Sequence, residues 1–226
     1  MKNYYDVLKK SKPFTGFTDE ELDEIIYFLN LSPVNFTKGS TVFNQGDLTS
    51  RSGILLEGRI IAESVSYSGV RRVMQTLKEG DLFGDVLMYS ENQPNPVSTL
   101  VKEDSTVLLL DITELMEKSC NLLCRRILIN ILHGLADKFW TLNRKIAYLS
   151  CNQMRQKIAM FLLDMQKRFS SATFIIEYSR EDLADLLGVN RSALSRELSR
   201  MQQEGIISYY KSSFKIENTD KLKACL

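Results

Sequence analysis

The sequence predicts an α+β protein in three parts: an antiparallel β sandwich or barrel, then a long helix, then a winged helix-turn-helix. Short apolar runs separated by glycines indicate the first part. An apolar stripe with a seven-residue period indicates the second part, and two short helices joined by a tight turn and followed by a hairpin indicate the third. We expect these parts to span residues 1–112, 113–149 and 150–226.

Length and composition exclude several classes of protein. A chain of 226 residues has room for two modest domains. No apolar run approaches the roughly 18 residues of a membrane span, and residues 1–6 lack the apolar segment of a secretory signal. Four cysteines are too few for a disulfide scaffold, so we expect a cytoplasmic protein with no membrane partner.

The first part combines a helix with several short strands. Thr18 and Glu21 have the spacing of a capping box, which predicts a helix that begins after Thr18. Seven of the eleven glycines lie between residues 39 and 84. Apolar runs at residues 41–43, 54–56, 59–62, 70–77 and 106–110 occupy the same region. Short strands between glycine turns are typical of an antiparallel sandwich or barrel.

A regular apolar stripe marks the middle of the chain. Its spacings alternate between four and three residues over three heptads, which is typical of a helix that pairs in parallel with its own copy. The alternative is a core helix packed along one stripe of its own domain. The candidate residues of this dimer seam are Leu128, Leu132, Leu135, Phe139, Leu142, Ile146 and Leu149.

The last part contains the most informative motif of the chain. Ser179, with Asp182 three residues later, can cap a first short helix, and Asn190 can cap a second. Gly188 supplies the positive φ that the tight turn between the helices needs. The apolar contacts between the two helices come from Leu183, Leu187, Val189, Leu194 and Leu198.

Arginine and serine side chains on the second of these helices suit DNA. Arginine forms a bidentate pair of bonds with guanine in the major groove, and serine bonds bases or phosphates. A hairpin at residues 206–216 with a basic tip completes a winged motif, so we expect double-stranded DNA as a partner. The candidate DNA-binding residues are Ser179, Arg180, Asn190, Arg191, Ser192, Ser195, Arg196, Arg200 and Lys211.

Four segments carry a resemblance to a known family: residues 43–47 (Phe-Asn-Gln-Gly-Asp), 56–59 (Leu-Glu-Gly-Arg), 80–85 (Gly-Asp-Leu-Phe-Gly-Asp) and 183–198. Across essentially its whole length the chain resembles the family of the cAMP receptor protein and the fumarate–nitrate reduction regulator. The resemblance implies a β-roll, which is a jelly-roll-like double-stranded β-helix, with a cyclic-nucleotide-binding-like sensor role. It also implies a homodimeric transcription regulator that binds a near-palindromic operator, responds to a small effector and contacts RNA polymerase.

In that family three positions of the second helix contact bases. By resemblance they fall on Arg191 or Ser192, on Ser195 and on Arg196. Arg200 lies one turn further along the helix and suits a phosphate.

The chain departs from the nucleotide-binding members of the family at two places. Those members have Phe-Gly-Glu, which holds the ribose, and a later Arg-Ser or Arg-Thr, which holds the cyclic phosphate. Here the first motif ends in Asp85, and the second falls on Asn95 and Pro96, which offer the phosphate neither a charge nor a hydroxyl. We therefore expect an unknown effector other than cAMP. The candidate pocket residues are Phe83, Gly84, Asp85, Leu87, Asn95, Val97, Ser98, Phe139 and Trp140.

Thiol and haem chemistry has three candidate residues. The first cysteine is Cys120, so the N-terminal iron–sulfur cluster of the oxygen-sensing members is not expected. Cys120 and Cys124, at i and i+4 of the long helix, are either a redox or haem-ligating pair with thiol pKa values lowered by basic neighbours, or two ordinary helix cysteines. His133 is either a haem ligand, a pH-sensitive dimer contact or a solvated side chain.

Two other functions stay open at this point. A β-roll that has lost its effector would leave a constitutive DNA-binding regulator. An enzyme would need a nucleophile–base pair or a metal cluster; the sequence displays neither, so we do not expect an enzyme.

The near-neutral net charge of +1 hides a separation of charge along the chain. Residues 1–142 carry 15 basic and 19 acidic side chains, whereas residues 143–226 carry 14 basic and 9 acidic ones. A basic C-terminal part is what phosphate contacts require.

Overall fold

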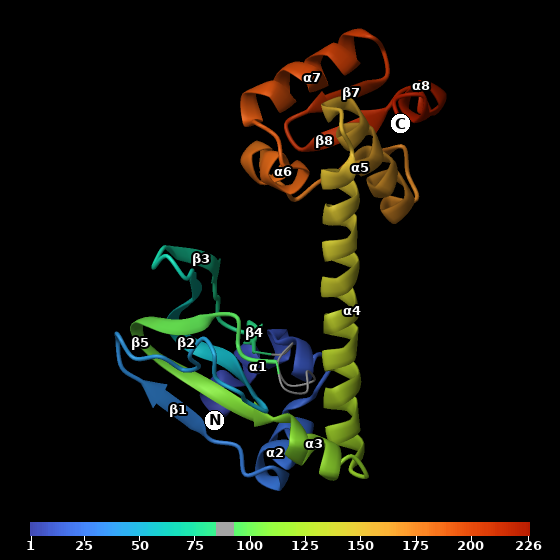
Figure 1. Ribbon diagram of the computed structural model, residues 1–226. Helices are drawn as coiled ribbons and strands as arrows, with labels where there is room; N and C mark the ends of the chain where they lie inside the picture. Colours follow the sequence, from blue (N-terminus) through green and yellow to red (C-terminus); the bar gives the residue numbers. More distant parts are fainter. Residues whose placement is uncertain (85–92) are drawn as a thin grey trace. The chain divides into compact units, whose positions relative to one another are not determined.

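The computed structural model describes residues 1–84 and 93–226, and Figure 1 shows its elements. These residues form two compact units, residues 1–137 and 138–226. Asp85 and Leu87, two of the candidate pocket residues, lie outside the described residues.

Short helices precede the sheet of the first unit. They are the 3-10 helices η1 (Lys2–Tyr4) and η2 (Lys12–Phe14) and the α-helices α1 (Tyr5–Lys10) and α2 (Asp19–Phe28). The capping box expected at the start of α2 is confirmed, because the Thr18 hydroxyl accepts a bond from Glu21 N and the Glu21 carboxylate accepts one from Thr18 N. Leu8 and Leu22 of these helices are fully buried and pack in one core with strand residues such as Ile54.

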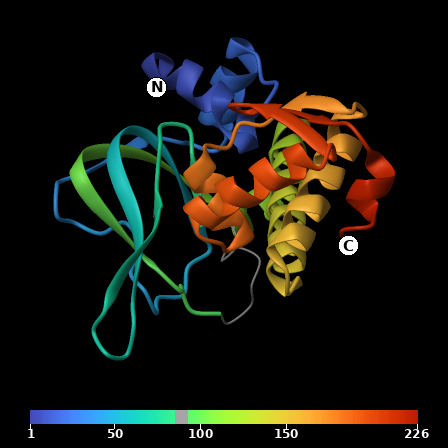
Figure 2. The ribbon, with the colours of Figure 1, turned by 90° about the horizontal axis from the view of Figure 1, so that it is seen from above.

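The sheet of the first unit is antiparallel, as the glycine-punctuated apolar runs predict. Its strands are β1 (Pro33–Phe36), β2 (Arg51–Val65), β3 (Arg71–Thr76), β4 (Leu82–Phe83) and β5 (Ser98–Asp111). The order is β1-β5-β2-β3, with β4 also paired to β2. The hairpin of β2 and β3 extends away from the rest of the sheet (Figure 2), and every residue of β3 is exposed.

The two predicted strands at residues 54–56 and 59–62 are one continuous strand, β2, so the expectation of a turn between them is wrong. The glycine between them, Gly58, has a φ of +96° within a run of register shifts opposite β5. A Cβ at this position would overlap the backbone of Asp104 and Ser105. Gly58 therefore serves a β-bulge, where two backbones approach closely, rather than a chain reversal.

A small core fills the inside of the β-roll. Its buried members include Phe43, Leu55, Ile60, Phe83 and Val107. The predicted strand at residues 41–43 is reduced to one isolated bridge, Thr41 with Leu100. The α+β class with an N-terminal β-roll is confirmed.

The long helix predicted over residues 113–149 is interrupted, which corrects that prediction. A short helix α3 (Ile112–Glu117) is followed by a turn, and α4 (Leu122–Ser150) then continues for 29 residues. The break has a local cause: the side-chain oxygen of Asn121 accepts bonds from the backbone N–H groups of Leu123 and Cys124, at 2.8 and 3.2 Å. This capping starts a new helix at residue 122.

The second unit is a winged helix-turn-helix, as predicted. After the end of α4 come α5 (Met154–Phe169), β6 (Thr173–Ile175), α6 (Arg180–Leu187), α7 (Arg191–Gln203), β7 (Ile207–Tyr210), β8 (Ser213–Ile216) and α8 (Thr219–Lys223). The three strands form an antiparallel sheet in the order β6-β8-β7.

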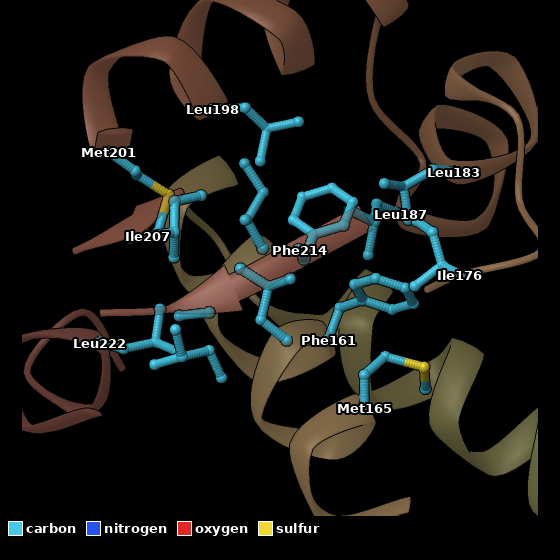
Figure 3. Close-up of a cluster of buried hydrophobic side chains, with 14 of the residues drawn as sticks. Phe161, Met165, Ile176, Leu183, Leu187, Leu198, Met201, Ile207, Phe214 and Leu222 are labelled. Atoms are coloured by element: carbon cyan, nitrogen blue, oxygen red, sulfur yellow. The ribbon is translucent and has the colours of Figure 1, made fainter. Parts of the chain in front are cut away.

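Figure 3 shows how the core of this second unit joins its helices to its sheet. Phe161 and Met165 of α5, Leu187 of α6, Leu198 of α7 and Phe214 of β8 are all buried in one cluster. Tyr148, near the end of α4, is 2% exposed in the same cluster and donates a hydrogen bond of 2.8 Å to Asp164. The last turns of α4 are thus built into the core of the second unit.

Candidate nucleic-acid interface

The helix-turn-helix is set by three capping residues, all at the positions that the sequence predicts. The Ser179 hydroxyl accepts a bond of 3.1 Å from Asp182 N, and the Asp182 carboxylate accepts one of 3.1 Å from Ser179 N. Gly188 ends α6 with a φ of +61° in the left-handed region. The Asn190 side-chain oxygen accepts bonds from Ser192 N and Ala193 N at the start of α7. These bonds satisfy backbone donors that a helix start would otherwise leave open.

Replacing Gly188 with alanine is expected to lower the free energy of unfolding of this unit by about 1–3 kcal/mol. The φ of +61° disfavours any side chain, and a Cβ there would also overlap the side chain of Leu149. Gly205→Ala is the matched control, because Gly205 has a φ of +68° with open space around its Cβ position. Thermal unfolding followed by circular dichroism should show the larger loss for Gly188→Ala. Equal losses would mean that the Leu149 contact has no energetic role.

The outer face of α7 presents the predicted arginines. Arg191, Arg196 and Arg200 are exposed, whereas Leu194 and Leu198 on the opposite face are buried. Arg200 lies 3.6 Å from the Glu197 carboxylate. Within the described residues no ion pair engages Arg191 or Arg196. Their guanidinium groups therefore keep their donors available to a partner.

The predicted serines of α7 are used partly inside the helix. The Ser192 hydroxyl donates to the Asn190 side-chain oxygen at 2.6 Å, and the Ser195 hydroxyl donates to the Arg191 carbonyl at 3.1 Å. Each hydroxyl oxygen still has acceptor capacity. These two serines can therefore accept from a base or a bridging water while their own protons stay in the helix.

An ion-pair network that the sequence did not predict joins α7 to α5. Arg155 of α5 donates to Glu197 at 2.6 Å and forms two bonds with Glu204 at 2.7 and 2.8 Å. These bonds raise the pKa of Arg155 and lower the pKa of Glu204. The two carboxylates lie in the middle and just beyond the end of α7, so Arg155 fixes the helix to α5 along much of its length. In the sequence, the acidic residue Glu197 directly after Arg196 is a sign that this part of α7 has a basic partner.

The wing is the hairpin of β7 and β8, with Lys211 at its tip. Lys211 has a φ of +51°, and its ammonium lies 5.6 Å from the centre of the Tyr210 ring. The Arg180 guanidinium, which the sequence analysis assigns to DNA, points instead to the wing: it donates to the Lys211 carbonyl at 2.7 Å.

Among the described residues of the candidate effector pocket, the polar residues Asn95 and Ser98 form hydrogen bonds with other groups of the chain. Asn95 is buried, its N–H donates to the Asp47 carbonyl and its side-chain oxygen accepts from Val97 N at 3.2 Å. Pro96 has no N–H to offer. The Ser98 hydroxyl accepts from Gln45 N at 2.8 Å.

The aromatic candidates of this pocket divide into one buried residue and two exposed ones. Phe83 is buried, with its ring centre 5.6 Å from that of Phe43, and Gly84 has a φ of +75° beside Phe43. Phe139 and Trp140, the pocket candidates on α4, are 59% and 61% exposed and contact each other edge to face.

The expected placement of Cys120 and Cys124 on one face of the long helix is wrong. Cys120 is exposed in the turn before α4, whereas Cys124 is fully buried inside the first turn of α4. Burial raises the pKa of the Cys124 thiol, and the opposing effect of Lys118 is smaller, so the expectation of a lowered pKa is also wrong for this thiol. His133 is exposed. Among the described residues no three His, Cys, Asp or Glu side chains are grouped to hold a metal ion.

The stripe on α4 divides into two sets. Leu128 and Leu135 pack against the core of the first unit. The other five seam candidates are between 46% and 59% exposed: Leu132, Phe139, Leu142, Ile146 and Leu149. A row of large apolar side chains at heptad spacing on one exposed face is what a partner helix would cover.

Comparisons with known proteins agree with both units. Residues 33–118 match the model of the cyclic nucleotide-binding domain, and residues 156–225 match that of the Crp-like helix-turn-helix domain. The chain belongs to the Crp/Fnr family. Members of this family are DNA-binding transcription regulators, and so is this chain.

Two relatives of this family illustrate the degree of similarity. The cyclic AMP receptor protein of Thermus thermophilus is 26% identical over 202 residues, which are 88% of this chain and 89% of that protein. The fumarate and nitrate reduction regulatory protein of Escherichia coli is 26% identical over 221 residues, 93% of this chain and 84% of that protein. The crystal structure of the Thermus thermophilus catabolite activator protein has the same fold, with a TM-score of 0.55 at 23% identity over 95% of this chain and 98% of that one. Among the described residues no helix is both long and apolar enough to cross a membrane.

Proposed function

We propose that this Crp/Fnr-family regulator works as a homodimer that binds a near-palindromic operator and responds to an effector other than cAMP. The observation that carries the DNA-binding part is the exposed arginine face of α7, where Arg191 and Arg196 have no ion pair within the described residues. The dimer part rests on the exposed apolar stripe of α4. Two copies related by a twofold axis would place their α7 helices in successive major grooves, about 34 Å apart.

The proposed division of labour on α7 follows from side-chain chemistry. Arg196 and Arg191 read guanine edges, Ser192 and Ser195 add shorter polar contacts, and Arg200 and Lys211 meet phosphates. Ser179 and Asn190 cap the N-termini of α6 and α7. In the proposed complex these N-termini, which carry the positive ends of the helix dipoles, face the phosphates of the DNA.

The argument against cAMP rests on the missing donors at residues 95–97. A cyclic phosphate in a partly buried pocket needs a positive charge or several N–H and O–H donors, and an unpaired one costs several kcal/mol. Here the N–H groups of Asn95 and Val97 bond to other groups of the chain, and Pro96 has none. We therefore propose an effector whose chemistry differs from that of cAMP.

Signal transmission would use α4, since this helix carries the proposed seam and ends in the core of the second unit. Tyr148 is buried there and bonded to Asp164, so a change in the pairing of two α4 helices would move the core that holds α6 and α7. The effector need only bind one arrangement of the dimer better than another to shift the population.

Three further points complete the proposal. The named relatives are transcription regulators, which supports a function by binding rather than by turnover. By the same relationship to these regulators, we propose that the protein contacts RNA polymerase and works in the cytoplasm. A haem or redox sensor built on Cys120, Cys124 or His133 has less support, because the Cys124 thiol is buried and Cys120 lies outside α4.

Thermal unfolding in the presence of candidate ligands tests the effector proposal. A ligand at about 100 times its Kd stabilises a protein by about 2.7 kcal/mol, which is easily measured. We expect no stabilisation by cAMP. Stabilisation by another ligand, such as haem or a small organic anion, would identify an effector class and exclude the constitutive alternative; stabilisation by cAMP would contradict the proposal.

A further inference from the structure

Arg180, the first residue of α6, makes three contacts with the wing. Its guanidinium carbon lies 5.0 Å from the centre of the Tyr209 ring and 4.9 Å from that of Phe214. One of its terminal nitrogens donates to the Lys211 carbonyl at 2.7 Å. Burial among these groups lowers the pKa of Arg180, although the group stays charged at neutral pH.

The contacts of Arg180 join three elements of the DNA-binding unit. Arg180 belongs to α6, Tyr209 to β7 and Phe214 to β8. The Tyr209 hydroxyl lies 3.2 Å from the Ser199 hydroxyl of α7, at hydrogen-bonding distance. A continuous set of contacts therefore runs from the start of α6, through the wing, to α7.

The bond from Arg180 reaches the wing at a residue with an unfavourable backbone conformation. Lys211 is a non-glycine residue with a φ of +51°, a conformation that costs free energy and that surrounding contacts must maintain. Its ammonium is the charge at the wing tip. An anchored carbonyl fixes the direction in which this side chain leaves the hairpin.

We propose that Arg180 is a positioning residue that orients the wing, so that Lys211 contacts a DNA phosphate, instead of contacting DNA itself. This inference rests on the proposed DNA-binding function. The two rings beside the guanidinium and its donated bond to Lys211 leave it poorly placed for a phosphate. A planar guanidinium can stack on rings and donate at the same time, whereas the lysine ammonium is a point charge that cannot reproduce both contacts.

The test compares Arg180→Lys, Lys211→Ala and the double variant with the wild-type chain. Operator affinity is measured by fluorescence anisotropy over a series of salt concentrations. We expect Arg180→Lys, although it keeps the charge, to lose about five- to tenfold in affinity near 0.1 M salt, as Lys211→Ala does. Both variants should lower the salt slope by about one, and the double variant should be no weaker than Lys211→Ala alone. Arg168→Lys is the matched control: Arg168 is an exposed arginine of α5, beside the Phe169 ring and outside the proposed DNA contacts, so this variant keeps its charge and should retain affinity.

Direct phosphate contact by Arg180 predicts the opposite pattern and would overturn the inference. In that case Arg180→Lys keeps its affinity and slope, and the effects of the two substitutions add. Hydrogen exchange of the wing amides without DNA provides a second readout: protection at residues 210–213 should fall in Arg180→Lys and stay unchanged in Arg168→Lys. Unchanged protection in both would also overturn it. A wild-type chain that binds no operator would instead contradict the proposed function, leaving the exchange result to decide the role of Arg180.

Discussion

Replacing Leu142 with aspartate is expected to convert the proposed dimer into a monomer at micromolar concentration. Leu142 is 59% exposed on α4, in the row of seam residues that a second copy would cover. Burying a leucine is worth about 1.5–3 kcal/mol, so two lost leucines weaken the dimer by about 3–6 kcal/mol. Two carboxylates facing each other in the seam add to this loss. The dimer Kd should therefore rise at least about a hundredfold.

Sedimentation or light scattering measures this change directly, and Ala147→Asp is the matched control. Ala147 is also exposed on α4, but it lies outside the seam positions. It gains the same charge and should stay dimeric. A Leu142→Asp chain that remains as dimeric as the control would remove α4 as the pairing helix. Leu135 is a poorer site for this test, because it packs against the core of its own unit and its loss would also affect folding.

Replacing Arg196 with alanine is expected to cost about 1–3 kcal/mol in operator affinity and to relax the preference at one base pair of each half-site. The side chain is exposed and takes part in no ion pair within the described residues, so its loss should leave the melting temperature unchanged. Competition binding against all four base pairs at each operator position measures the loss of preference. An unchanged preference at every position would contradict the assignment of Arg196 to a base.

Arg200→Ala distinguishes base reading from phosphate contact on the same helix. Arg200 is exposed one turn further along α7 and already lies near Glu197. We expect its loss to weaken binding to specific and non-specific DNA alike and to lower the salt slope by about one. Arg196→Ala should act mainly on specific DNA.

The features that the sequence predicted well are those set by neighbouring residues. Ser179, Gly188 and Asn190 act through backbone groups two or three residues away, so their spacing alone indicates two capped helices and a tight turn. The apolar stripe of α4 can also be located from sequence, because residues three and four positions apart lie on the same face of a helix. Short capping motifs fix φ, ψ and hydrogen bonds within one turn of helix.

The features that the sequence did not predict depend on contacts between distant residues. A glycine between two apolar runs predicts a turn at Gly58, but the close approach of residues 104 and 105, on another strand, makes it a bulge. Arg180 is a DNA-binding candidate by sequence, whereas the structure places it beside Tyr209 and Phe214, which lie about 30 residues later in the chain. Arg155 stands 42 residues before Glu197, and no local pattern connects them.

The most direct test of the central claim is selection of binding sites from random duplex DNA by the purified full-length chain. A homodimer that places two α7 helices on one face of the duplex should enrich an inverted repeat whose half-sites are centred about 10 bp apart. The Leu142→Asp chain should lose this enrichment in the same experiment. Enrichment of an inverted repeat with that spacing is the result that we predict, and enrichment of single, unpaired half-sites by the wild-type chain would contradict the account.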